Sequence, residues 1–189
     1  MADVDAHAWD DRYAAEDRVW GGEPNRFVVQ YLGDLPPGSA IDLGAGEGRN
    51  SVWLAQQGWD VTAVDFSATG LRKARQMASE AGVPLATVAE DVSAFDPTVP
   101  VDLVLLCYLQ IPDEHQIALL RRLPDWLHEG GAVFVVAHDK ANTVGGPPDP
   151  AVRYSVEQTV AALEGLRIDV AEVLDRDGAL DTVVLAVKA

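Results

Sequence analysis

The sequence has little cysteine and little positive charge, and each scarcity excludes a class of protein. Its one cysteine, Cys107, rules out an intrachain disulfide and a zinc site built from cysteine clusters. There are 14 Lys and Arg residues against 30 Asp and Glu, a formal net charge of −16. That charge disfavours non-specific binding to nucleic acid, which needs a basic surface, and suits a neutral or cationic ligand.

Signals for export and membrane insertion are also missing. The first residues, MADVDAHAWDDRY, are acidic and have no basic segment followed by an apolar one, so we do not expect a signal peptide. No apolar run reaches the roughly 18 residues of a membrane span. We therefore expect a cytoplasmic enzyme or binding protein, with residues 1–189 forming a single domain.

What the sequence does contain is an alternation of apolar runs and helical patterns. Apolar runs predict strands at 40–43, 59–65, 84–91, 101–109 and 132–139. Helices are predicted at 24–32, 48–58, 67–82, 113–131 and 155–165. Two more strands, 166–176 and 179–189, flank Asp177–Gly178, a pair typical of a tight hairpin turn.

This order predicts an α/β fold with a doubly wound, mostly parallel, seven-stranded sheet and a C-terminal antiparallel hairpin. In such sheets, ligands bind beyond the carboxyl ends of the strands. Functional side chains are therefore expected in the loops that follow the strands, namely 44–48, 65–67, 90–93, 107–112 and 138–150.

The stretch IDLGAGEGRN, after the first strand, brings three glycines close to a helix start. No Lys-Ser/Thr pair closes it, so it is not a nucleotide P-loop. A dinucleotide site stays open, because Gly44 and Gly46 match a G-x-G pattern and Asp65 follows at a suitable distance. Asp42 argues against it, since a carboxylate repels a pyrophosphate and attracts the sulfonium and ammonium groups of S-adenosylmethionine (SAM).

IDLGAGEGRN followed by VTAVDFS resembles the first two motifs of the class I SAM-dependent methyltransferases. The similarity runs from about residue 9 to 189 and is greatest to the small single-domain branch that includes tellurite-resistance and thiopurine-type enzymes. The resemblance implies a Rossmann-like fold and in-line methyl transfer from SAM to a small molecule, giving S-adenosylhomocysteine (SAH). Residues 1–38, which contain WDDRY and RVWGGEPNRF, resemble a lid over SAM.

The resemblance also implies roles for particular residues. Residues 42–46 would wrap the methionine end of SAM, Asp65 would bind the ribose hydroxyls, and Phe66 would pack on the adenine. Asp91 would reach the adenine amino group. The expected SAM-binding residues are Tyr13, Trp20, Asp42, Gly44, Ala45, Gly46, Arg49, Asp65, Phe66, Asp91, Val92 and Cys107.

The catalytic group is less defined by the sequence. A soft anionic acceptor needs no general base, whereas an oxygen or nitrogen acceptor often does. His138 ends the fifth predicted strand before a long Gly/Pro loop, so we predict His138 and Tyr108 as catalytic residues, with His115 as an alternative. No metal site is predicted, and either a monomer or a homodimer is compatible with the sequence. Two rival functions stay open: a nicotinamide-dependent oxidoreductase, and a SAM-binding sensor without catalysis.

Overall fold

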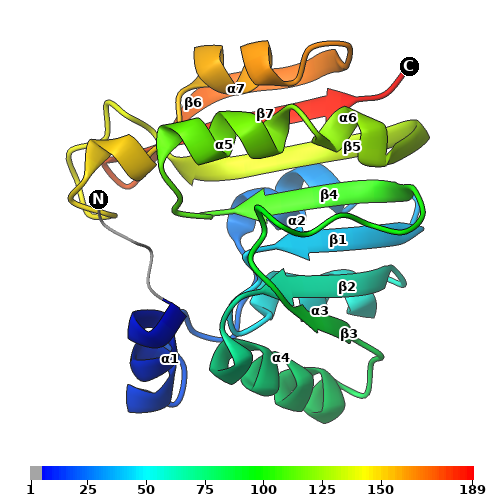
Figure 1. The fold of residues 1–189 in the computed structure, drawn as a ribbon, viewed down its shortest axis with the longest axis vertical. Helices are drawn as coiled ribbons and strands as arrows, with labels where there is room; N and C mark the ends of the chain where they lie inside the picture. Colours follow the sequence, from blue (N-terminus) through cyan, green and yellow to red (C-terminus); the bar gives the residue numbers. More distant parts are fainter. Residues whose placement is uncertain (1–5) are drawn as a thin grey trace. The chain divides into compact units, whose positions relative to one another are not determined.

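The structure is a computed structural model that describes residues 6–189 (Figure 1). The first few residues of the acidic leader lie outside the described part. The strands follow the order β3-β2-β1-β4-β5-β7-β6 in one seven-stranded sheet, and β7 is antiparallel to both of its neighbours. This confirms the predicted mostly parallel α/β sheet with its C-terminal antiparallel hairpin. The chain divides into two compact units, Met1–Phe95 and Asp96–Ala189.

The first unit contains three parallel strands and the helices packed around them. Its strands are β1 (Ser39–Leu43), β2 (Asp60–Asp65) and β3 (Ala86–Ala89). Its helices are α1 (Ala6–Ala15), α2 (Arg26–Leu32), α3 (Arg49–Gln56) and α4 (Ala68–Ala81). Ser67 caps the start of α4 by accepting a hydrogen bond from the Gly70 N–H, and Gly82 ends the helix in the left-handed conformation, so α4 lies within the predicted range 67–82.

The second unit contains the strands β4 (Val101–Cys107), β5 (Leu127–His138), β6 (Arg167–Arg176) and β7 (Ala179–Val187). Its helices are α5 (Asp113–Leu120), α6 (Leu123–Trp126), the 3₁₀ helix η1 (Pro150–Val152) and α7 (Val156–Ala162). The turn between β6 and β7 is formed by Asp177 and Gly178, whose φ angles of 57° and 89° are the positive values that a two-residue hairpin turn favours. The predicted hairpin is therefore confirmed.

The predicted helix over 113–131 is wrong in its second half. A short α6 follows α5, and β5 already begins at Leu127. Pro124, at the start of α6, has no N–H to continue the hydrogen bonding of α5. Gly131 lies inside β5, where a Cβ would come within 2.9 Å of the His128 carbonyl oxygen and 3.0 Å of that of Val101. This glycine thus allows a close backbone approach and does not end a helix.

The leader contains one helix more than the sequence pattern predicted. The expected helix at 24–32 begins at Arg26, where the Asn25 side chain accepts hydrogen bonds from two backbone N–H groups. The preceding α1 packs against α4 and was not predicted. Among the described residues, no helix is long and apolar enough to cross a membrane.

Candidate functional site

The loop between β1 and α3 is held by its own hydrogen bonds. The Gly44 and Ala45 N–H groups both donate to the Val64 carbonyl oxygen, at 2.9 and 3.1 Å, and the Gly48 N–H donates to that of Ala45. The Gly46 N–H donates to Asp65 Oδ2 at 2.8 Å. Because these four amides already have partners, the loop does not present them as free donors for a pyrophosphate.

Glycine is required in this loop by both conformation and space. Gly44, Gly46 and Gly48 have φ angles of 71°, 54° and 80°, a region that residues with a Cβ rarely adopt. A Cβ on Gly46 would lie 2.6 Å from the Tyr13 hydroxyl oxygen, and one on Gly48 would lie 2.5 Å from the Ala74 Cβ. The loop is therefore closely packed between the leader and α4.

Two buried carboxylates lie beside the loop. Asp42, only 1% exposed, accepts a hydrogen bond from the Ser51 hydroxyl at 2.6 Å, and Asp65 accepts 2.8 Å bonds from the Gly46 and Ser67 N–H groups. Burial raises the pKa of Asp42 to about 6. The hydrogen bond from Ser51 lowers this pKa, and the nearby charge of Asp65 raises it. Burial also raises the pKa of Asp65. A bound cation would favour the ionised form of both acids.

Residues of the leader pack on this loop and on the start of α4. Tyr13 is buried, and its ring lies 5.6 Å from that of Trp9. The Arg12 guanidinium lies 4.7 Å from the ring centroid of Trp20, which is 40% exposed. Asp10 accepts hydrogen bonds from the Ser67 hydroxyl and the Thr69 N–H. The described part of the leader thus packs on the glycine loop and on α4, and its role as a lid stays a prediction.

Glu47, which sequence reasoning missed, ties the leader to the glycine loop. Its buried carboxylate accepts hydrogen bonds from the Val19 N–H at 2.8 Å and the Trp20 N–H at 3.3 Å. It also pairs with Lys73 Nζ at 2.8 Å, and that ammonium donates to the Glu16 carbonyl oxygen. An acid flanked by glycines was visible in the sequence, but nothing in the pattern indicated its partners.

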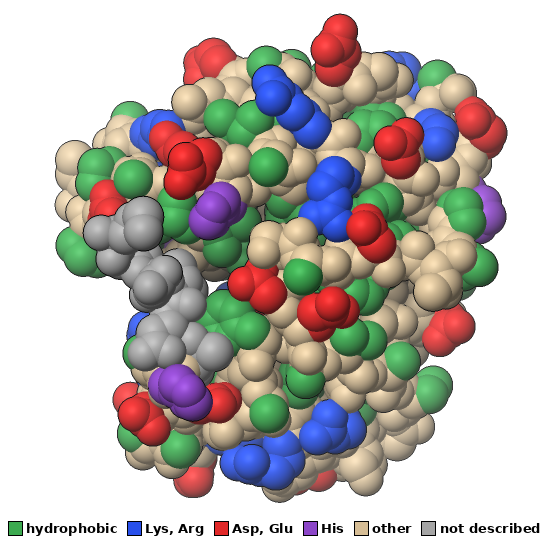
Figure 2. Space-filling view, in the orientation of Figure 1, with side chains coloured by type: hydrophobic (Ala, Val, Ile, Leu, Met, Phe, Trp, Pro, Cys, Tyr) green, Lys and Arg blue, Asp and Glu red, His purple; other side chains and the backbone are tan. Residues whose placement is uncertain are grey.

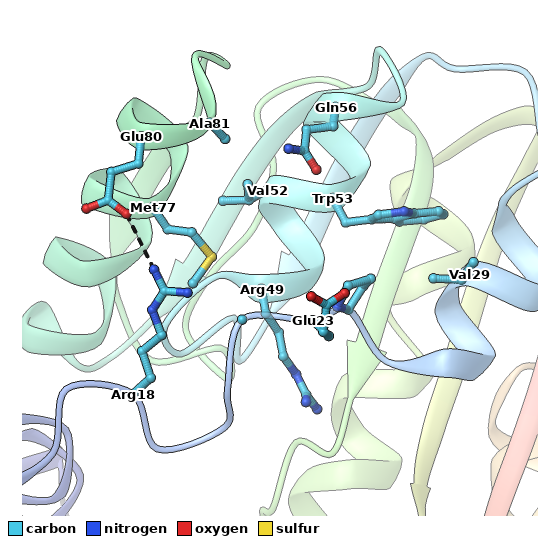
Figure 3. Close-up of a pocket in the computed structure, with 12 residues that line it drawn as sticks. Arg18, Glu23, Val29, Arg49, Val52, Trp53, Gln56, Met77, Glu80 and Ala81 are labelled. Carbon is cyan, nitrogen blue, oxygen red and sulfur yellow. Dashed lines mark hydrogen bonds and ion pairs between the residues drawn. The ribbon is translucent and has the colours of Figure 1, made fainter.

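A separate groove of about 600 Å³ lies beside α3 (Figure 3). It is bounded by the leader, α3 and the end of α4, and Arg18 reaches across from the leader to Glu80 at 3.4 Å. Of the predicted SAM-binding residues, only Arg49 lines it. Arg49 also donates a hydrogen bond to the Trp20 carbonyl oxygen at 3.2 Å. The groove therefore does not include the buried acids of the loop.

The predicted adenine contacts follow β2 and β3, which are neighbouring strands. Phe66 is partly exposed, Val92 is buried, and the Glu90 N–H donates to the Asp65 carbonyl oxygen. Asp91 is exposed and accepts hydrogen bonds from the N–H and hydroxyl of Ser93. The strand ends thus bring the two loops together as expected, and the roles assigned to their side chains stay predictions.

In the second unit, four polar side chains meet where β4, β5 and β6 end. Asp181, on β7, is fully buried and stands opposite His138 in the β5–β7 register. Its Oδ2 accepts hydrogen bonds from the Tyr108 hydroxyl and Arg176 Nε, both at 2.7 Å. Its Oδ1 lies 3.4 Å from His138 Nδ1. The structure therefore brings together the two predicted catalytic residues and adds an acid and an arginine.

The charges in this cluster are stabilised by one another. Burial alone would raise the pKa of Asp181, but the nearby His138 and the hydrogen bonds from Arg176 and Tyr108 outweigh it and hold that pKa below its usual range. Burial and the Asp181 charge raise the pKa of the Tyr108 hydroxyl well above its usual value. Asp181 is thus an anion and Tyr108 a neutral phenol near neutral pH.

Other residues near these strand ends have different surroundings. Cys107, the last residue of β4, is partly buried. His115 is exposed and lies 4.0 Å from Glu114. The Asp139 carboxylate accepts hydrogen bonds from the Thr182 hydroxyl and the Ala141 N–H, so it anchors the 140–150 loop. Within the described residues, no cluster of His, Cys, Asp and Glu could hold a metal ion.

The combination of this sheet and this loop defines the class of protein. Residues 40–131 match the family described as a methyltransferase domain. The strand order with β7 antiparallel is the Rossmann-like methyltransferase order. The chain belongs to the class I SAM-dependent methyltransferases.

Among curated proteins, the chain is similar to the probable SAM-dependent methyltransferase TehB of Haemophilus influenzae, with 23% identity over 64% of this chain and 43% of that protein. It is also similar to thiocyanate methyltransferase 1 of Arabidopsis thaliana, with 26% identity over 77% of this chain and 67% of that protein. The chain spans 33% and 43% of the length of two curated relatives that it matches.

Solved structures show the same fold. The crystal structure of Haemophilus influenzae TehB superposes with a TM-score of 0.77 at 17% identity, over 96% of this chain and 67% of that one. Magnesium protoporphyrin IX methyltransferase from Synechocystis, solved with bound SAM, superposes with a TM-score of 0.72 at 18% identity, over the full length of both chains. Structural relatives therefore bind SAM on this scaffold.

Proposed function

We propose that this protein transfers a methyl group from SAM to a small-molecule acceptor and releases SAH. The observation that carries the proposal is the placement of Asp42 and Asp65, two buried acids beside a loop whose amides are paired internally. Such a loop suits the sulfonium and ammonium of SAM and repels the pyrophosphate of a nicotinamide cofactor. In this proposal the protein acts as one cytoplasmic domain, as a monomer or homodimer, with residues 1–38 as its lid.

Within this proposal, each predicted residue has a physical task. The carboxylate of Asp65 accepts hydrogen bonds from the ribose hydroxyls. The adenine lies beside the partly exposed Phe66 and the loop at Asp91. The charge of Asp42 acts through the loop, because its side chain is buried. Tyr13 and Trp20 close over the methionine end, which excludes water from the reacting centre.

SAM supplies an electrophilic methyl group on a positively charged sulfur. The chain's own contribution is to hold the acceptor in line with that methyl group and to keep water out. The net charge of −16 favours small-molecule acceptors over nucleic acid. The relative from Arabidopsis is named for thiocyanate, a small anion.

The first experiment compares ligands by calorimetry and thermal shift on the intact protein. We expect stabilisation by SAM and SAH but not by NAD or NADP. Stabilisation by NAD alone would favour the oxidoreductase and overturn the proposal. Incubation with labelled SAM and a metabolite extract then separates an enzyme from a sensor, because a sensor binds SAM but labels no metabolite.

A substitution tests the ribose contact. Asp65→Ala should weaken SAM binding by about tenfold or more, because hydrogen bonds to a charged group are lost. Asp60→Ala, at the exposed start of the same strand, is the matched control and should bind SAM as the unchanged protein does. Equal affinities for the two variants in calorimetry would contradict the assignment of Asp65.

A further inference from the structure

We propose that His138 and Asp181 act as a base and its orienting carboxylate, so that the methyl acceptor is a neutral molecule with an ionisable O–H or N–H group. This inference rests on the proposed methyl transfer and narrows its acceptor class. In this proposal His138 is the catalytic residue, because it takes the proton of the acceptor. Asp181, which acts through His138, would be a positioning residue.

The geometry of the pair is set by the sheet. The β5–β7 register places His138 opposite Asp181, and Nδ1 and Oδ1 face each other at 3.4 Å. Each of these two atoms is buried and has no hydrogen-bond partner among the described residues. A small rotation of the imidazole would therefore form an Nδ1–H···Oδ1 hydrogen bond and satisfy both atoms.

The Asp181 carboxylate is fixed from its other side. Oδ2 accepts from the Tyr108 hydroxyl and from Arg176 Nε, so the carboxylate cannot turn away from the imidazole without breaking two bonds. A proton held on Nδ1 leaves the lone pair of Nε2 as the proton acceptor of the ring. The same logic orients the histidine of hydrolase triads, where the acid fixes the tautomer and supports the imidazolium.

A glycine packs closely against the imidazole on the side of Nε2. Gly146, in the 140–150 loop, has a φ of 77°, and a Cβ there would lie 2.9 Å from His138 Nε2 and 2.7 Å from Cδ2. Its neighbour Gly145 has a similar φ of 65° but nothing within 4 Å of a Cβ. The two glycines thus differ in whether a side chain would crowd the imidazole.

The titratable and charged groups around His138 come from every neighbouring element of its unit. They are Cys107 and Tyr108 at the end of β4, Asp139 after β5, Arg176 at the end of β6 and Asp181 on β7. The Asp139 carboxylate accepts hydrogen bonds from the Thr182 hydroxyl and the Ala141 N–H. Asp181 is thus the carboxylate that faces the imidazole.

The acceptor X–H donates its proton to His138 Nε2, and the electron pair on X forms the bond to the methyl carbon. The carbon–sulfur bond breaks with its pair remaining on sulfur, which becomes neutral in SAH. The proton on the imidazolium, supported by Asp181, then leaves to solvent. A soft anion such as thiocyanate or iodide has no proton to lose and would not need the pair.

The closing experiment measures the rate of methyl transfer from labelled SAM to two kinds of probe, catechol and 4-nitrophenol against thiocyanate and iodide. We expect transfer to the protic probes. His138→Gln should lower this rate by about 100-fold or more, and Asp181→Asn should lower kcat by about tenfold or more with little change in KM. Gly146→Ala should lower the rate of transfer to the protic probes about tenfold more than the matched variant Gly145→Ala does.

A second measurement needs no acceptor. Nitrogen-15 NMR of the imidazoles in the SAH complex, with His138 assigned by comparison with His138→Gln, reports the tautomer. We expect the proton on Nδ1 in the unchanged protein and a shift towards Nε2–H in Asp181→Asn. A proton on Nε2 in the unchanged protein overturns the base assignment, as does transfer to thiocyanate and iodide alone. Failure to bind SAM or SAH in calorimetry would instead overturn the proposed function.

Discussion

At the scale of single residues, this protein keeps charge where burial makes it costly. Asp42 is 1% exposed and Asp65 is 7% exposed. Burial raises the pKa of both carboxyl groups, and the Asp65 charge raises the pKa of Asp42 further. Ionised carboxylates buried without a counter-charge destabilise a folded protein. This arrangement is understandable at a site that is completed by a cation.

The first residue-scale prediction concerns Asp42→Asn. The folded protein holds the Asp42 proton up to about pH 6, whereas the unfolded chain releases it near pH 4. Below about pH 4 the Asp42 carboxyl group is protonated in both states and does not affect the free energy of unfolding. Between about pH 4 and pH 6 it destabilises the folded state increasingly, and above about pH 6 the loss is on the order of 3 kcal/mol. Asp42→Asn should raise the melting temperature near pH 7.5 and change it little near pH 4.

The same variant separates stability from binding. Asp42→Asn should bind SAM more weakly near pH 7.5, because it removes a negative charge beside the loop while retaining an acceptor for the Ser51 hydroxyl. Asp60→Asn, an exposed site on the next strand, serves as the control and should change neither property. A lower melting temperature for Asp42→Asn near pH 7.5 would show that the buried charge is already neutralised.

Some of these residues were predictable and others were not, for a physical reason. Asp42 and Asp65 were found because they stand at strand ends with a fixed spacing from the glycines. Asp181 and Arg176 were missed because their partners are set by the pairing of β5, β7 and β6, which the sequence pattern does not align. A lone acid among the apolar residues of β7 was the available signal.

At the scale of elements, the leader is attached to the glycine loop through few contacts. Asp10 binds the start of α4, and Glu47 binds the backbone of Val19 and Trp20 while pairing with Lys73. Glu47 is 2% exposed, so its carboxylate depends on these donors. Glu47 is thus a buried side chain that joins the leader to the glycine loop.

We predict that Glu47→Ala loosens the lid without unfolding the sheet. Removing the acceptor leaves two backbone N–H groups without their partner and leaves the Lys73 ammonium with the Glu16 carbonyl oxygen alone, which should cost about 2–4 kcal/mol locally. Hydrogen exchange should show faster exchange of the Val19 and Trp20 amides, with the strands β1 and β2 unchanged.

The control for this prediction is an exposed ion pair that also involves the leader. Arg18 and Glu80 are 45% and 55% exposed, and such pairs contribute little, typically within about 1 kcal/mol. Glu80→Ala should therefore leave the exchange at Val19 and Trp20 nearly unchanged. Equal effects of Glu47→Ala and Glu80→Ala would mean that the buried link does not hold the lid.

Most elements could be predicted because their signals are local. The caps of α4 and the Asp177–Gly178 turn depend on a few adjacent residues, and both are as predicted. The helix predicted over 113–131 is wrong in its second half because Gly131 lies close to the backbone of β4, a contact that a local pattern does not contain. Helix α1 lacks a clear apolar stripe, so its packing on α4 decides its position.

At the scale of the whole molecule, the dominant property is negative charge. The net charge is −16, and on the face shown in Figure 2 the acidic side chains are scattered among the basic ones and do not gather in one patch. A field of this sign attracts cations over a distance set by the salt concentration. It would therefore act on SAM, which has a net positive charge, more than on SAH, which has none.

The last prediction uses this difference between the two ligands. Raising the salt from about 0.05 M to about 0.5 M shortens the screening length from about 14 Å to about 4 Å. The affinity for SAM should then fall by about two- to fivefold, while the affinity for SAH changes by less than about twofold. Calorimetry with both ligands at both salt concentrations measures this ratio, and Asp42→Asn should reduce the salt effect on SAM. If salt lowered the affinities for SAM and SAH equally, the negative charge of the protein would not discriminate between substrate and product. The buried acids would then have to select SAM by direct contact alone.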